Sequence, residues 1–204
     1  MLVTAITEHD KRRNRIFIDG TFAFLLYKGE IKTYGVKVDA ELTPEQYECI
    51  VEEVLLKRAK LRAMNLLTAK SYTKEKLRQK LEQGLYPLDV IEGALSYVEQ
   101  FGYIDDDAYA ADFIAYNAQG MNRKQMIKKL RSRGVAPDVI ERQLEYYLES
   151  GEHIDEIAQI RAFLRKKGYV PGETSEEQIY KLKGALFRKG FDSDNISDAF
   201  RSFT

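Results

Sequence analysis

The side chains that most often perform catalysis are scarce in this sequence. The chain holds two histidines, His9 and His153, and one cysteine, Cys49, which lies on an acidic helical segment. No serine or cysteine stands in a pattern with histidine that would make an activated nucleophile. The glycine-rich loops that hold nucleotide phosphates are also missing. We therefore predict that the protein is not an enzyme and needs no cofactor.

An acidic run, residues 105–107, can be interpreted in two ways. Neighbouring carboxylates can bind Mg²⁺. Carboxylates at the start of a helix instead cap free amides and meet the positive end of the helix dipole. Because Asp155 and Glu156 occupy the matching place in a later segment that must also begin a helix, we favour capping and predict no metal site.

Basic side chains gather in three segments, although Lys+Arg 32 balances Asp+Glu 32 and the net charge is zero. Acidic residues concentrate elsewhere, at 39–53, 105–112 and 149–156. A single basic helix is usually a solvated face, but three equivalent ones favour a surface for a polyanion or an acidic partner. The predicted binding residues are Lys74, Lys76, Arg78, Lys80, Arg123, Lys124, Lys128, Lys129, Arg131, Arg133, Lys181, Lys183, Arg188 and Lys189.

Several tyrosines could add base stacking to such a surface. Tyrosines at helical spacing are more often packing residues whose hydroxyl reaches solvent, so we do not use them as evidence for a binding surface. The residues in question are Tyr72, Tyr86, Tyr103, Tyr109 and Tyr116.

The elements that must position these side chains change character near residue 42. Segments 2–6, 15–19 and 21–27 are rich in β-branched and aromatic residues, and Asp19-Gly20 is a strong hairpin signal. Beyond them the apolar period becomes helical, beginning with Thr43 as cap and Pro44 at the first helical position. Further helix starts are expected at Thr73, Pro87, residues 105–107, Asn122, Pro137, Asp155, residues 174–175 and residues 192–194.

Those helix starts repeat. Residues 73–95 align with 122–144 at a shift of 49, and the second segment aligns again at a shift of 56, where residues 168–175 form an inserted loop. Leucine, a glycine turn, aspartate and isoleucine recur together at fixed offsets, which indicates an internal repeat. The positions predicted to be buried are Leu77, Leu81, Ile91, Met126, Leu130, Ile140, Leu182, Leu186 and Ile196.

The fold class that follows is mainly α: three tandem three-helix repeats forming an elongated curved chain, with a small N-terminal β-meander. We expect the meander at residues 1–42 and the repeats at 43–103, 104–153 and 154–204. No segment reaches the roughly 20 apolar residues that span a bilayer. A protein without membrane contact, located in the cytoplasm, is therefore expected.

One motif resembles a known family. Gly102, Tyr103, Asp105 and Asp106, followed by Tyr109 and Ala110, are similar to the GY(L/I)DD-x-x-(F/Y)A signature of the RecX family. The resemblance extends over residues 57–148 and, more loosely, over 155–200.

The resemblance implies a non-enzymatic regulator of the RecA recombinase. Such a protein would bind the RecA–single-stranded DNA filament, inhibit its ATPase, coprotease and strand-exchange activities, and so modulate recombinational DNA repair and the SOS response. We expect a monomer with weak affinity for single- or double-stranded DNA. The alternative is a stand-alone helical-repeat protein that binds DNA or RNA. Zero net charge favours the first interpretation, because stand-alone nucleic-acid binders usually carry a basic excess.

Overall fold

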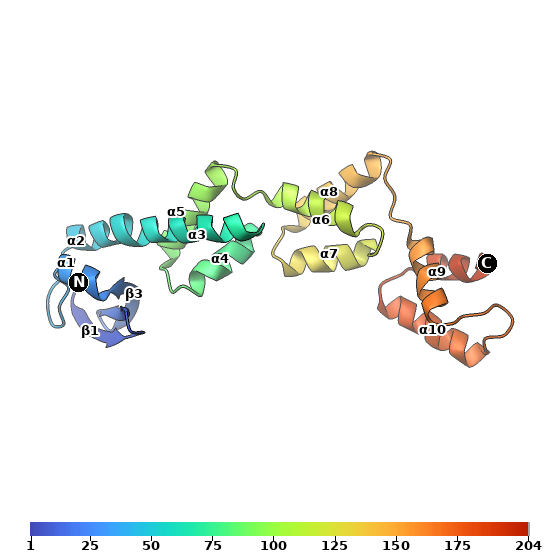
Figure 1. The fold of residues 1–204 in the computed structure, drawn as a ribbon, viewed down its shortest axis with the longest axis horizontal. Coiled ribbons are helices and arrows are strands. Elements are labelled where there is room, and N and C mark those ends of the chain that lie inside the picture. The colour runs from blue at the N-terminus through green and yellow to red at the C-terminus, as the bar shows by residue number, and fades with distance from the viewer. Residues whose placement is uncertain (204) are drawn as a thin grey trace. The chain divides into compact units, whose positions relative to one another are not determined.

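The computed structural model describes residues 1–203 and divides into two compact units, residues 1–105 and the chain from residue 106 onward. The protein is mainly helical, with one small sheet at its N-terminus (Figure 1). The predicted fold class is therefore confirmed in its secondary structure and in its three-helix domains. Within residues 1–203, no helix is both long and apolar enough to cross a membrane.

The N-terminal sheet has three antiparallel strands in the order β1-β2-β3. They span Val3–Glu8, Arg13–Ile18 and Thr21–Tyr27, close to the segments expected from the sequence. Asp19 and Gly20 join β2 to β3 with φ of 48° and 82°. Positive φ at both central residues is what a tight hairpin turn requires, so the hairpin prediction is confirmed.

A short helix, α1 (Lys28–Thr33), follows the sheet and was not predicted. Its first turn is held by Glu30, whose carboxylate accepts a hydrogen bond of 2.7 Å from the backbone N–H of Tyr27. The same carboxylate accepts two hydrogen bonds of 2.5 and 2.6 Å from Arg58. The N-terminal segment is therefore a meander with one added helical turn.

A long helical rod begins at Pro44 and dominates the first unit (Figure 1). It comprises α2 (Pro44–Cys49), a π-helical segment (Ile50–Leu56) and α3 (Lys57–Ala69). Thr43 caps it as predicted, since its side chain accepts a hydrogen bond from the N–H of Gln46.

Two further helices, α4 (Lys74–Glu82) and α5 (Leu88–Gln100), complete the first unit. Side chains from the sheet, the rod, α4 and α5 form a single hydrophobic core, with Phe24, Leu55 and Leu95 among its buried members. The helices stabilise the small meander, because its buried side chains belong to the same core as those of the helices.

Residues 106–203 of the second unit form six helices in two groups of three, each group with its own hydrophobic core. The first group is α6 (Asp106–Asn117), α7 (Arg123–Ser132) and α8 (Pro137–Glu149). The second is α9 (Glu156–Lys166), α10 (Glu176–Arg188) and α11 (Ser193–Arg201).

Eight of the nine repeat positions expected in the core are buried, from Leu77 to Ile196. The exception is Leu182, which is only half-buried. It borders an open hollow together with Gly168 and Thr174 of the inserted loop. Beside this loop, a position that is buried in the other two repeats is therefore only partly covered.

Candidate nucleic-acid and partner interface

Helix α7 carries the densest group of cations, and its packing decides where they point. Met126 and Leu130 are fully buried in the core of the first helical group of the second unit. Because residues four apart share one helix face, these two anchors turn the intervening Lys128 and Lys129 outward, and both are exposed. Asn122 caps the helix: its Oδ1 accepts a hydrogen bond of 2.8 Å from the N–H of Gln125.

The cations in the first turn of α7 already have carboxylate partners. Arg123 forms an ion pair of 2.5 Å with Glu141 of α8. Lys124 pairs with Asp192, 68 residues further along the chain at the start of α11. These two cations link α7 to its neighbours, so they serve the fold as well as any surface.

The cations in the second half of α7 lack such carboxylate partners within residues 1–203. Lys128, Lys129 and Arg131 are exposed, and no carboxylate within residues 1–203 lies in ion-pair range of them. We call these three residues the α7 basic face. Arg133 is not part of it, because its guanidinium donates to the Tyr109 hydroxyl at 2.8 Å and stacks 4.5 Å from the Phe113 ring centre.

Helix α10 places its cations mainly against its own unit. Lys181 pairs with Glu177 at 2.5 Å. Lys183 lies 5.4 Å from the ring centre of Phe200, and Lys189 lies 5.6 Å from that of Phe163. Arg188 is exposed and has no ion-pair partner among the described residues.

The end of α10 meets the start of α7. The carbonyl of Lys189 accepts hydrogen bonds of 3.1 Å from the side-chain amides of both Asn122 and Gln125. A Cβ on Gly190 would lie 3.3 Å from the Cβ of Lys124, so the two backbones approach closely. The two predicted basic helices of this unit are therefore neighbours.

Helix α4, in the first unit, shows the most compensated charge. Lys74 pairs with Glu99 at 2.7 Å, and Arg78 pairs with both Glu75 and Glu92. The side chains of the other two lysines donate to glutamine amides: Lys76 to Gln79 at 3.0 Å and Lys80 to Gln83 at 3.1 Å.

The glycine–tyrosine motif begins at the end of the first unit and continues into α6. Gly102 has φ of +68°, which favours glycine after a helix C-terminus. Tyr103 is 56% exposed and stacks on Phe101 with ring centres 6.2 Å apart. Ala110 is fully buried, so the motif combines a turn, an exposed ring and a core position.

The acidic run that follows begins α6, which starts at Asp106 as predicted. Asp107 has a role that the sequence did not reveal. Its Oδ1 accepts hydrogen bonds of 2.6 Å from Arg142 and 2.8 Å from Gln143, both on α8. These contacts hold the pKa of Asp107 below its ordinary value. Among residues 1–203, no group of three or more metal-ligating side chains gathers.

Comparisons with known proteins agree on one family. Models of the first and third three-helix domains of RecX match residues 59–97 and 154–200. "Regulatory protein RecX" of Caldanaerobacter subterraneus is 32% identical over 201 residues, covering 98% of both chains. The protein of the same name from Trichlorobacter lovleyi is 31% identical over 69% of this chain and 92% of its own.

Two solved structures share the fold. A crystal structure titled regulatory protein RecX aligns with a TM-score of 0.65 over 99% of this chain and 100% of its own, at 20% identity. RecX from Lactobacillus salivarius aligns with a TM-score of 0.60 over 73% of this chain and 96% of its own, at 19% identity. With full-length similarity to the curated relative and the same fold, the chain belongs to the RecX family of regulatory proteins.

Proposed function

We propose that this protein is a non-enzymatic regulator that binds the RecA–single-stranded DNA filament and inhibits its ATPase, coprotease and strand-exchange activities. It would thereby modulate recombinational DNA repair and the SOS response in the cytoplasm, acting as a monomer. The observation that carries this proposal is the similarity to a regulatory RecX protein over 98% of the chain.

The α7 basic face supports a contact with such a filament. Its three cations are exposed and have no carboxylate partner within residues 1–203. They can therefore attract DNA phosphates or acidic side chains of RecA without first breaking an internal ion pair. Attraction of this kind weakens with salt, because phosphate contacts release counterions.

The test compares two triple variants in a RecA ATPase assay on single-stranded DNA. The first is Lys128→Glu, Lys129→Glu and Arg131→Glu. The matched control makes the same change of charge at three exposed lysines outside α7: Lys32, Lys37 and Lys166. We expect wild type and control to inhibit RecA, and the α7 variant to lose inhibition and filament binding while keeping its helical circular dichroism. Equal inhibition by both variants would contradict a role for this face.

A second function, stand-alone binding of DNA or RNA, is favoured by the same unpaired cations. The two functions differ in their need for RecA. Titration of labelled single-stranded DNA with and without RecA separates them. Tight binding that RecA does not increase, with no change in its ATPase rate, would favour the stand-alone binder.

A further inference from the structure

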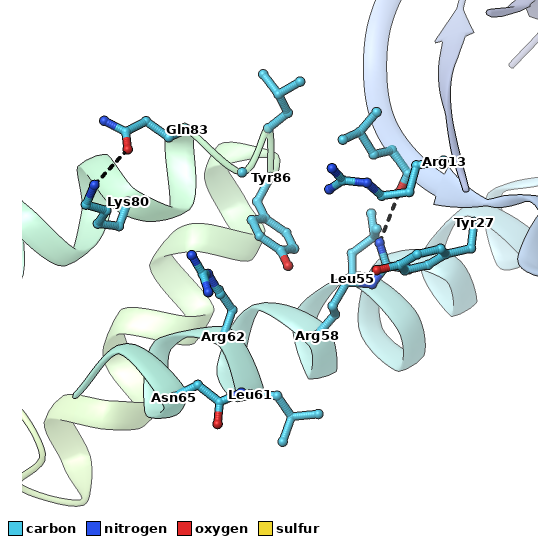
Figure 2. Close-up of a pocket in the computed structure, with 13 residues that line it drawn as sticks. Arg13, Tyr27, Leu55, Arg58, Leu61, Arg62, Asn65, Lys80, Gln83 and Tyr86 are labelled. Atoms are coloured by element: carbon cyan, nitrogen blue, oxygen red, sulfur yellow. Dashed lines mark hydrogen bonds between the residues drawn. The ribbon is translucent and has the colours of Figure 1, made fainter. Parts of the chain in front are cut away.

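A pocket of about 490 Å³ lies in the first unit between the sheet, α3 and the turn from α4 to α5 (Figure 2). Its lining includes four cations and no carboxylate. The cations come from three elements: Arg13 from β2, Arg58 and Arg62 from α3, and Lys80 from α4. Only Lys80 is among the binding residues predicted from the sequence, because the other three cations lie outside the basic segments.

Two of these cations are already neutralised from outside the pocket. Arg13 pairs with Asp10 at 2.7 Å, and Arg58 pairs with Glu30 at 2.5 Å. Neither carboxylate belongs to the lining. Arg62 has no ion-pair partner within residues 1–203, and the ammonium of Lys80 donates only to a neutral amide at the pocket rim. The pocket therefore keeps a positive charge that an anion can neutralise.

Aromatic and aliphatic side chains complete the walls. In Figure 2 the hydroxyls of Tyr27 and Tyr86 point into the space that the guanidiniums of Arg13 and Arg62 also face. Burial raises the pKa of the Tyr86 hydroxyl and outweighs the opposite effect of the neighbouring arginines. The hydroxyl therefore stays protonated at neutral pH and can donate a hydrogen bond. Leu61 is 50% exposed but lies on the other side of α3 from Tyr86 in Figure 2, so the Tyr86 ring is the surface left for a flat base.

The position of the Tyr86 ring is set by a glycine. A Cβ at Gly84 would lie 2.8 Å from the ring carbon Cε2 of Tyr86, so the ring packs directly on the backbone of this turn. The Tyr27 ring is held by Arg58, whose guanidinium carbon lies 4.7 Å from the ring centre. Both rings are thus fixed before any ligand arrives, which lowers the entropic cost of binding.

We propose that this pocket binds a nucleotide, with its phosphate beside Arg62 and Lys80 and its base against the ring of Tyr86. Guanidinium groups match phosphate oxygens in bidentate geometry, and aromatic rings stack on bases whatever their sequence. An acidic peptide would use the cations but would leave the aromatic surface without a partner. The inference goes beyond regulation of RecA, since the pocket requires no other protein.

The test uses the full-length protein alone and follows the backbone amides of Gly84 and Leu85 by NMR. Thymidine monophosphate, a short oligothymidylate, inorganic phosphate and oligoglutamate are added in separate titrations. The key variant is Arg62→Ala, and the control is Lys57→Ala, an exposed lysine on the same helix outside the pocket. Both positions are exposed, so both variants should fold like wild type.

We expect saturable shifts with both nucleotide ligands and an affinity about tenfold lower in Arg62→Ala, the effect of losing one charge-assisted contact. Lys57→Ala should bind like wild type. Tighter binding of the oligonucleotide would mean that the pocket serves a strand, and equal binding that it serves free nucleotides. Phosphate binding as tightly as the mononucleotide, shifts with oligoglutamate alone, or no shifts at all would each overturn the proposal. RecA inhibition is read in a separate assay, so either proposal can fail alone.

Discussion

Asn122 performs two structural tasks that can be separated by substitution. The side chain is fully buried. Its Oδ1 caps α7 by accepting from the N–H of Gln125 at 2.8 Å, and its Nδ2 donates to the carbonyl of Lys189 at 3.1 Å. One side chain thus starts a helix of one three-helix group and ties it to the next group of the same unit.

The expected cost of each task follows from these contacts. Losing an N-cap costs about 1 kcal/mol. Losing one buried hydrogen bond between the groups costs about 1 kcal/mol, without the larger penalty of an orphaned carbonyl. That penalty is avoided because Gln125 also donates to the Lys189 carbonyl at 3.1 Å. Asn122→Ala should therefore lower the free energy of unfolding by about 2 kcal/mol, the sum of the two losses.

Asn122→Ser isolates the second task, since serine is a good N-cap but is too short to reach Lys189. We expect it to cost about 1 kcal/mol, half the effect of alanine. The measurement is urea unfolding followed by far-ultraviolet circular dichroism. Equal costs for serine and alanine would refute the capping contribution. A serine variant as stable as wild type would refute the contribution of the contact to Lys189.

Other predictions concern burial, titration and charge. Leu130→Ala should lower the free energy of unfolding by about 2–5 kcal/mol, because it leaves a cavity in a sealed core. Leu182→Ala should lower it clearly less, because Leu182 is already partly open to solvent. Urea unfolding of both variants checks this order. The Asp107 carboxylate has a lowered pKa in the folded state. Its contribution to stability is therefore fully present above pH 3.8, the ordinary pKa of aspartate, and is lost as the pH falls through the folded pKa. The stability difference between wild type and Asp107→Asn should therefore shrink on acidification; a difference that grows would contradict this sign. Filament binding should weaken with salt, and less steeply in the α7 variant; equal salt slopes in a binding assay would argue against that face.

The parts of the fold that local chemistry controls could be predicted from the sequence. Thr43, Asn122 and Ser175 each cap a helix through the side-chain oxygen expected at that position. The hairpin at Asp19-Gly20 likewise depends on two adjacent residues and their φ angles. Helix α1 was missed because its first turn depends on Glu30, which is held by Arg58, 28 residues away.

The charge partners could not be predicted, because they depend on tertiary packing. Asp107 meets Arg142 across 35 residues, and Lys124 meets Asp192 across 68. A helical wheel places Lys124 with Lys128 and Arg131 on one face, but it cannot show which of them another helix will approach. The pocket cations Arg13 and Arg62 were overlooked for the same reason, since β2 and α3 are distant in the sequence.

The three basic helices therefore carry charge for different reasons, although their sequences look alike. On α4, glutamates of α5 lie opposite Lys74 and Arg78, so these cations stabilise the packing of two helices. On α7, the first turn packs beside Gly190, and the cation there finds an acidic partner in the same contact. The basic residues in the second half of α7 form no ion pair within residues 1–203, and their charge stays available. A basic segment becomes a candidate binding surface only where the fold leaves its cations without a carboxylate, and in the second unit that condition holds best at Lys128, Lys129 and Arg131.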